Sequence, residues 1–191
     1  MRPVLFIVAV SMVLSGCATK LDGERYRDLQ PSFDLFNFFD GEVMAWGVVQ
    51  NRKGELVQRF EVSILGDIKD NTLTLDETFR YGLGRGVEKR VWSIERLPDG
   101  RYRGSAGDIL GEATGDGYGN AFRWRYSMDL PLDDGTVRVK FDDWIWALDD
   151  SRIINRSYIQ KFGLDVAEVT IFMQRKTPER VDLLASLPRA R

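Results

Sequence analysis

The sequence predicts an all-β protein, an antiparallel up-and-down β-barrel of about nine or ten strands. Three observations support this prediction. Apolar and polar residues alternate with a period of two in several segments, as in strands with one buried face. Short clusters of Gly, Asp, Asn and Pro separate these segments, as hairpin turns do. No segment between residue 35 and residue 176 has a helical period. Closure into a barrel would remove the exposed edge strands, and a sandwich of two sheets is the alternative.

The alternation is clear along most of the chain. Phe60, Val62 and Ile64 share one face of "FEVSI", and "NAFRWRYSM" places Phe122, Trp124, Tyr126 and Met128 on one face and arginines on the other. The expected strands, in order, cover residues 41–51, 56–67, 72–81, 88–97, 101–107, 110–116, 121–129, 136–147, 152–162 and 167–175. Between them stand turn sequences such as Pro98-Asp99-Gly100.

The N-terminus "MRPVLFIVAVSMVLSGC" predicts a lipoprotein signal peptide over residues 1–16. Its apolar run is shorter than a membrane span, and Leu14-Ser15-Gly16-Cys17 resembles a bacterial lipobox. Cys17 is the only cysteine, so we expect it to carry the lipid. In lipoproteins of this type, an Asp directly after the acylated Cys tends to retain the protein at the inner membrane. Ala18 stands at that position here, which favours the periplasmic face of the outer membrane. The expected division is an acylated flexible tether over 17–34, a barrel over 35–176 and a tail over 177–191.

Five motifs together resemble an uncharacterised family of Gram-negative lipoproteins, a domain of unknown function: "FFDGEVMAWG", "LDETFRYG", "GDILGEATGDGYGNAFRWRY", "VKFDDWIWALDD" and "NRSYIQKFG". The resemblance implies no established activity. A weaker similarity is to lipocalins, which begin their barrel with Gly-x-Trp and place an Arg late in it. Here Glu42-Val43 follows Gly41, so that Trp is missing at this spacing, and Trp46 and Arg175 are the candidate substitutes. This similarity makes the expected barrel lipocalin-like.

Composition excludes several functions. The chain has 191 residues, no His and a formal net charge of −2, with no long basic run, so we expect no nucleic-acid binding. The lack of His removes histidine triads and the commonest zinc motifs, and no phosphate or dinucleotide fingerprint is present. We therefore expect no metal, no cofactor and no enzymatic activity, in a protein that is a monomer. Carboxylates would be the route to catalysis if there were one.

Aromatic residues predict a cavity lining, although the same residues could fill a solid core. The candidate lumen residues are Trp46, Phe79, Trp92, Trp124, Tyr126 and Trp144. Strand parity also points Glu77 and Arg90 inward as a buried polar pair. In "FDDWIWALDD", either Asp143 points inward and joins them, or a bulge turns the tryptophans inward instead. Asp149-Asp150 is expected to be a turn without function.

The leading hypothesis is an outer-membrane-anchored periplasmic protein that binds a lipid, such as a fatty acid, or another apolar molecule. One alternative is an envelope interaction module with a filled barrel. A third reading is a carboxylate-dependent enzyme that acts on lipid, which requires facing acids among Glu77, Asp142 and Asp143.

Overall fold

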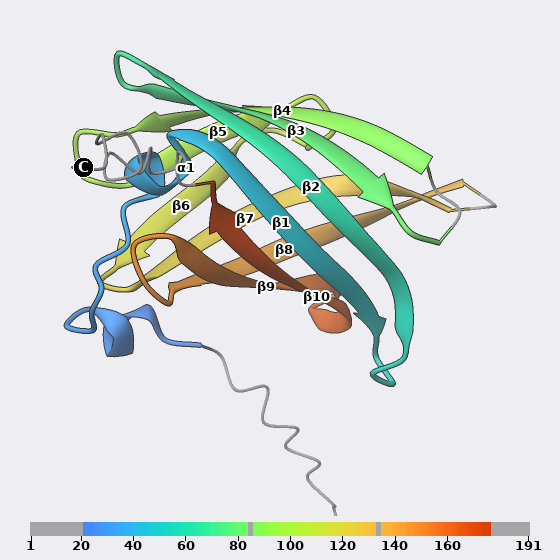
Figure 1. Ribbon diagram of the computed structural model, residues 1–191. Helices are drawn as coiled ribbons and strands as arrows, with labels where there is room; N and C mark the ends of the chain where they lie inside the picture. The colour runs from blue at the N-terminus through green and yellow to red at the C-terminus, as the bar shows by residue number, and fades with distance from the viewer. Residues whose placement is uncertain (1–20, 84–85, 133–134, 177–191) are drawn as a thin grey trace, which may run out of the picture.

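The computed structural model describes residues 21–83, 86–132 and 135–176, and its ten antiparallel strands close into one lipocalin-like barrel (Figure 1). This confirms the predicted fold class. The strands are β1 (Gly41–Asn51), β2 (Leu56–Lys69), β3 (Thr72–Tyr81), β4 (Gly86–Arg96), β5 (Tyr102–Ala106), β6 (Ala113–Tyr118), β7 (Ala121–Leu132), β8 (Gly135–Ala147), β9 (Arg152–Lys161) and β10 (Leu164–Arg175). Cys17, the predicted signal peptide and the predicted tail over 177–191 lie outside the described residues.

Each strand pairs with its neighbours in the sequence, and β1 closes the barrel by pairing with β10. β5 and β6 are the short strands, and their mutual ladder joins only three residue pairs, Tyr102 to Gly104 with Gly115 to Ala113. The loop between them, residues 107–112, lies along β7 instead of extending the ladder. Its Ile109 forms an isolated bridge with Met128, and the amide of Leu110 donates to the carbonyl of Ser127 at 2.7 Å.

A short helix, α1 (Leu35–Phe39), closes one end of the barrel, a feature that the sequence analysis did not predict. Asp34 caps its N-terminus by accepting a hydrogen bond from the amide of Asn37 at 2.9 Å. Four of its five residues are buried: Leu35, Phe36, Phe38 and Phe39. Gly66 of β2 permits this packing, because a Cβ at that position would collide with the carbonyl oxygen of Phe39.

The segment over residues 21–34 is not a free tether in its described part; it forms a strap along the outside of the barrel. It contains a 3₁₀ helix, η1 (Gly23–Tyr26), and the ring of Tyr26 lies 6.0 Å from the ring of Trp144. The amide of Phe33 donates to the carbonyl of Gly119 at 2.8 Å. The structure therefore differs from the expected flexible tether over residues 21–34, because aromatic packing and backbone hydrogen bonds attach this segment to the barrel.

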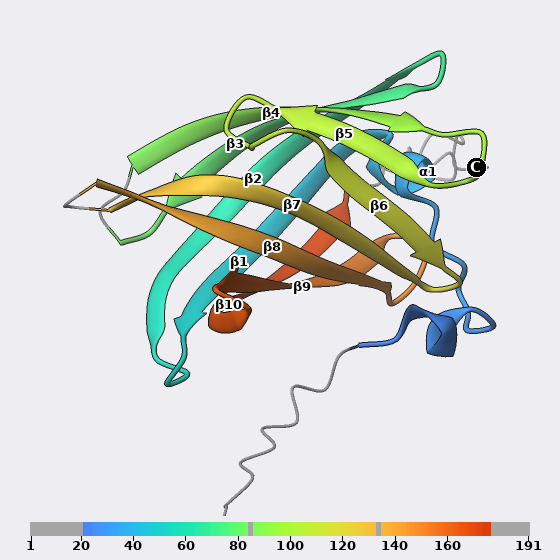
Figure 2. The same ribbon diagram turned by 180° about the vertical axis from the view of Figure 1, so that it is seen from behind.

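The barrel has two different ends. At the α1 end, the apolar side chains of α1 pack with inward-facing residues such as Leu73, Phe122 and Ile153 into one large core. A smaller apolar cluster around Met128, Val139, Ile159 and Val169 lines the other half. Figure 2 shows the barrel from behind, with α1 again at one end and the β1–β2, β7–β8 and β9–β10 turns at the other. Among the described residues, no helix is long and apolar enough to cross a membrane.

Candidate ligand cavity

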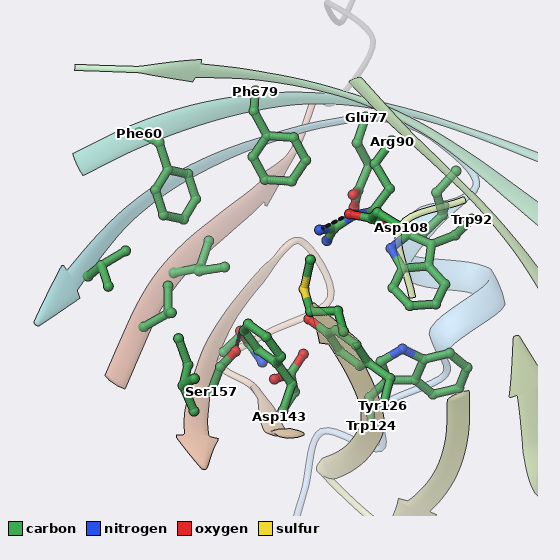
Figure 3. Close-up of a pocket in the computed structure, with 18 of the residues that line it drawn as sticks. Phe60, Glu77, Phe79, Arg90, Trp92, Asp108, Trp124, Tyr126, Asp143 and Ser157 are labelled. Carbon is green, nitrogen blue, oxygen red and sulfur yellow. Dashed lines mark hydrogen bonds and ion pairs between the residues drawn. The ribbon is translucent and has the colours of Figure 1, made fainter. Parts of the chain in front are cut away.

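A cavity of about 660 Å³ occupies the barrel interior above α1 (Figure 3). Leu35 and Phe39 of α1 form its base. Val57, Gln58 and Pro131 line it towards the opposite end, where Val57 and Pro131 are exposed to solvent. The barrel is therefore not filled, which removes the alternative of a solid interior. The volume lies within the usual range for small-molecule sites, about 300–1,000 Å³.

Aromatic rings from β3, β4 and β7 line this cavity. Phe79, Trp92, Trp124 and Tyr126, four of the six aromatic residues named from the sequence, face the lumen. Tyr126 stacks on Phe141 with ring centroids 4.8 Å apart, and Trp92 meets Tyr126 edge to face at 5.4 Å. Because stacked and edge-to-face rings restrain one another, the wall around Tyr126 is held in shape before any ligand arrives.

The prediction is wrong for Trp46, which lies on the outer surface of the barrel. Its side chain is 45% exposed and stacks on Phe172 of β10. The inward positions of β1 are taken by Val43, Ala45 and Gly47. Small residues are required at this place because a Cβ at position 47 would collide with the ring of Phe60 inside the barrel.

The prediction is also wrong for Trp144. The register of β8 runs without a bulge from Trp146 to Gly135, so Asp143 and Ile145 point inward while Trp144 points outward. Trp144 is nevertheless buried, with 1% of its surface exposed, because η1 covers it from outside. Arg123 lies over the ring of Trp144 and forms an ion pair with Asp142 at 2.6 Å on the same outer face.

The polar side chains inside the cavity form a cluster around Glu77, Arg90 and Asp143. Glu77 and Arg90 are cross-strand neighbours on β3 and β4, and Asp143 of β8 faces them across the lumen (Figure 3). The expected Glu77–Arg90 ion pair is replaced by another. The Nε and Nη2 atoms of Arg90 donate to Asp108 at 2.9 and 2.6 Å, because the 107–112 loop brings that carboxylate to the cavity wall.

Burial sets the protonation of the two remaining acids. It raises the pKa of Glu77 to about 7, an effect that the positive charge of Arg90 opposes. Burial likewise raises the pKa of Asp143 to about 7, and the neighbouring hydroxyl of Ser157 opposes this rise. The pKa of Tyr126 also lies well above its ordinary value through burial. One oxygen of each acid, Oε2 of Glu77 and Oδ1 of Asp143, is buried without a hydrogen-bond partner.

Three polar residues near the Glu77–Arg90–Asp143 cluster were not identified from the sequence: Asp108, Asn155 and Ser157. Asp108 lies in a loop, where strand parity gives no direction. Asn155 and Ser157 could have been found, since they alternate with Ile153 and Ile159 on the inward face of β9. Both are buried, and Ser157 donates to the side-chain oxygen of Asn155 at 3.2 Å.

The remaining acids of the sequence analysis lie elsewhere. Asp142 points outward, and Asp149 forms a turn with Ser151 and Arg152, as expected for a residue without a role in the cavity. Within the described ranges, no group of three or more His, Cys, Asp or Glu residues is placed to hold a metal ion. Glu77 and Asp143 do face the same cavity, and carboxyl groups with a pKa near 7 can donate or accept a proton at neutral pH.

The fold is similar to that of a solved structure, an S-type phycobiliprotein lyase from Guillardia theta. The TM-score is 0.56 at 10% sequence identity, over 75% of this chain and 92% of that chain. This corrects the expectation that the chain is not an enzyme: a barrel of this architecture carries the name of a lyase, so the lack of His does not exclude catalysis.

No curated protein matches the chain in sequence. One family model covers residues 11–175, which is nearly all of the strand-forming region together with the segment before it. The chain therefore belongs to the family described as "Protein of unknown function (DUF3833)".

Proposed function

We propose that this protein holds an elongated, mostly apolar ligand in the barrel lumen, with a polar group of the ligand at the Glu77–Asp143 cluster. The observation that supports this most directly is the cavity itself: about 660 Å³, closed by α1 at one end and lined by aromatic rings. Binding sites of this kind are mostly apolar with a few convergent polar groups. The similar lyase shares this barrel fold, which is compatible with an internal binding site.

The second part of the proposal is location. The lipobox-like sequence before Cys17 supports a lipoprotein of a Gram-negative cell, with its acyl chains in the outer membrane and the barrel in the periplasm. A lipid of the surrounding envelope is then the nearest source of an apolar ligand. Such a protein would take up lipid from the aqueous compartment and hold it away from water.

The binding proposal is tested with purified, delipidated barrel and the neutral fluorescent probe N-phenyl-1-naphthylamine. We expect a saturable isotherm. Ile171→Trp, which places a larger side chain in the lumen, should weaken probe binding by about tenfold or more, because the probe and the indole compete for the same volume.

The matched control is Phe172→Trp. Phe172 is the next residue of β10 and packs on Trp46 outside the barrel, so this variant should bind the probe like the wild type. Equal loss of binding in both variants, with folding intact by circular dichroism, would show that the probe does not occupy the lumen. A complete lack of saturable binding by the wild type would refute the proposed function.

A further inference from the structure

We propose that the lumen selects an amphiphile with a basic amine, whose ammonium group lies in the space between Glu77 and Asp143. This inference rests on the proposed function, since it names the class of ligand for the same cavity. It follows from three features of the described residues: the charge of the cavity wall, the ion pair of Arg90, and two buried acceptor atoms that have no hydrogen-bond partner.

The wall of the cavity holds more acidic than basic side chains. Among the described residues that line it, the acids are Glu77, Glu88, Asp108, Asp129 and Asp143, and the basic residue is Arg90. Asp108 is paired with Arg90, Asp129 is paired with Arg138 at 3.0 Å, and Glu88 has an interaction of its own, so Glu77 and Asp143 are the acids that a ligand in the lumen would meet. The low dielectric of an apolar cavity strengthens the attraction of a carboxylate for a cation and its repulsion of a carboxylate or phosphate of the ligand.

Arg90 does not offer a free positive charge to an anionic ligand. Its Nε and Nη2 atoms both donate to Oδ2 of Asp108, and its guanidinium lies 5.5 Å from the centre of the Phe79 ring. An anionic headgroup would have to compete with Asp108 for the guanidinium. Because the hydrogen bonds of Arg90 go to Asp108, neither Glu77 nor Asp143 has a direct ion-pair partner among the described residues.

The orphan atoms in the cluster are acceptors. Oε2 of Glu77 and Oδ1 of Asp143 are buried, line the cavity and have no hydrogen-bond partner. Buried polar atoms normally have one, so these two indicate donors supplied by a ligand. An ammonium group brings three donors and no acceptor, together with the missing positive charge.

Aromatic rings complete the environment of a cation. Trp92, Trp124 and Tyr126 line the same stretch of lumen, and their faces attract positive charge. The raised pKa values of Glu77 and Asp143 have the same physical origin, since burial without a cation makes the ionised carboxylates unfavourable. A bound ammonium would stabilise both ionised forms and release protons on binding. A hydroxyl has one donor, so it would satisfy one of the two acceptors and supply no charge.

The experiment compares four ligands with the same twelve-carbon chain: dodecylamine, dodecyltrimethylammonium, dodecanol and dodecanoate. Each displaces N-phenyl-1-naphthylamine from the full barrel at pH 7.5, below its micellar concentration. We expect dodecylamine to bind about tenfold or more tightly than dodecanol, and dodecanoate to bind most weakly. Dodecyltrimethylammonium, which has charge but no N–H donor, should lie between dodecylamine and dodecanol.

The double variant Glu77→Gln with Asp143→Asn should lose this preference, with the affinities for amine and alcohol within about twofold of each other when both are measured against the probe affinity of that same variant. Asp76→Asn is the matched control, since Asp76 is the exposed neighbour of Glu77 on β3 and points away from the lumen. Dodecanoate binding as tightly as dodecylamine, or an amine preference that survives the double variant, would overturn the inference. Failure of all four ligands to displace a probe that does bind would overturn it as well. If the probe itself does not bind, the proposed function fails first.

Discussion

Glu77 and Asp143 are the two residues of the cavity whose burial is unfavourable when their carboxyl groups are ionised. Their pKa values of about 7 lie above the ordinary values of 4.5 and 3.8, so the folded protein retains protons that the unfolded chain has released. The stability that these two groups contribute is present below about pH 4 and is lost as the pH rises towards 7. Above pH 8 both states are ionised, and the dependence ends.

This predicts that the free energy of unfolding of the ligand-free protein falls between pH 5 and pH 8. The double variant Glu77→Gln with Asp143→Asn should lose most of that slope and should be more stable than the wild type at pH 8, by about 1–3 kcal/mol for removal of buried charge. Urea unfolding at pH 5, 6, 7 and 8 measures both. A wild type and a variant with parallel pH profiles would show that these carboxyls are hydrated and unperturbed.

Single residues also show what sequence can predict about the site. Strand parity points Glu77, Arg90 and Asp143 inward, and all three line the cavity, because parity needs only the local backbone. The predictions for Trp46 and Trp144 are wrong because these residues were chosen for their aromatic character and not by strand parity, which points both side chains outward. One stacks on the outer surface, and the other is covered by a strap that lies more than a hundred residues earlier in the sequence. Contacts over such separations cannot be deduced from local periodicity.

At the scale of elements, the cap of the barrel depends on Asp34. This residue caps α1 and accepts hydrogen bonds from Arg96 of β4 at 3.0 and 2.8 Å, so it ties the strap, the helix and the wall together. Arg96 also lies over the ring of Phe36 at 4.8 Å. A helix of five residues has no stability of its own, and these contacts hold it in the barrel end.

Asp34→Ala should therefore destabilise the protein by about 1–2 kcal/mol, the cost of a lost helix cap with its ion pair. Thermal unfolding measures the change. The control is Asp99→Ala, which removes an exposed turn carboxylate paired with Arg101 and should change the unfolding temperature much less than Asp34→Ala does. Similar losses in the two variants would mean that α1 contributes little to stability.

The strands were predictable to within a few residues over most of the chain, because the Gly, Asp, Asn and Pro residues of the hairpin turns mark where each strand ends. The sixth strand is an exception: it was expected at residues 110–116 and runs from Ala113 to Tyr118. Residues 107–112 form the loop that carries Asp108, and their glycines resemble those of a bent strand. The helix α1 was missed because five residues are too few to show a helical period.

At the scale of the whole molecule, the proposed attachment depends on one atom, the thiol of Cys17. Cys17→Ser removes the nucleophile that would accept the diacylglyceryl group, so we expect an unprocessed or released protein instead of one in the outer-membrane fraction. Cell fractionation with a size measurement of the product tests this. Stability of the barrel should be unchanged, because Cys17 precedes every described element. A Cys17→Ser protein of mature size in the outer membrane would refute the anchor.

The strap over residues 21–34 would determine the orientation of an anchored barrel relative to the bilayer. If residues 18–34 were a free chain, the barrel could turn in any direction, but η1 packs on β6 and β7 from Gly23 onward, six residues after Cys17. Six residues span at most about 21 Å when fully extended. The strap starts beside η1, on the side of β6 and β7, and it leads to the α1 end. The closed end would therefore be held near the bilayer, and the open end would point into the periplasm. Ligand exchange would then take place with the aqueous compartment, or with a partner that approaches from it, and not with the leaflet that carries the protein's own acyl chains.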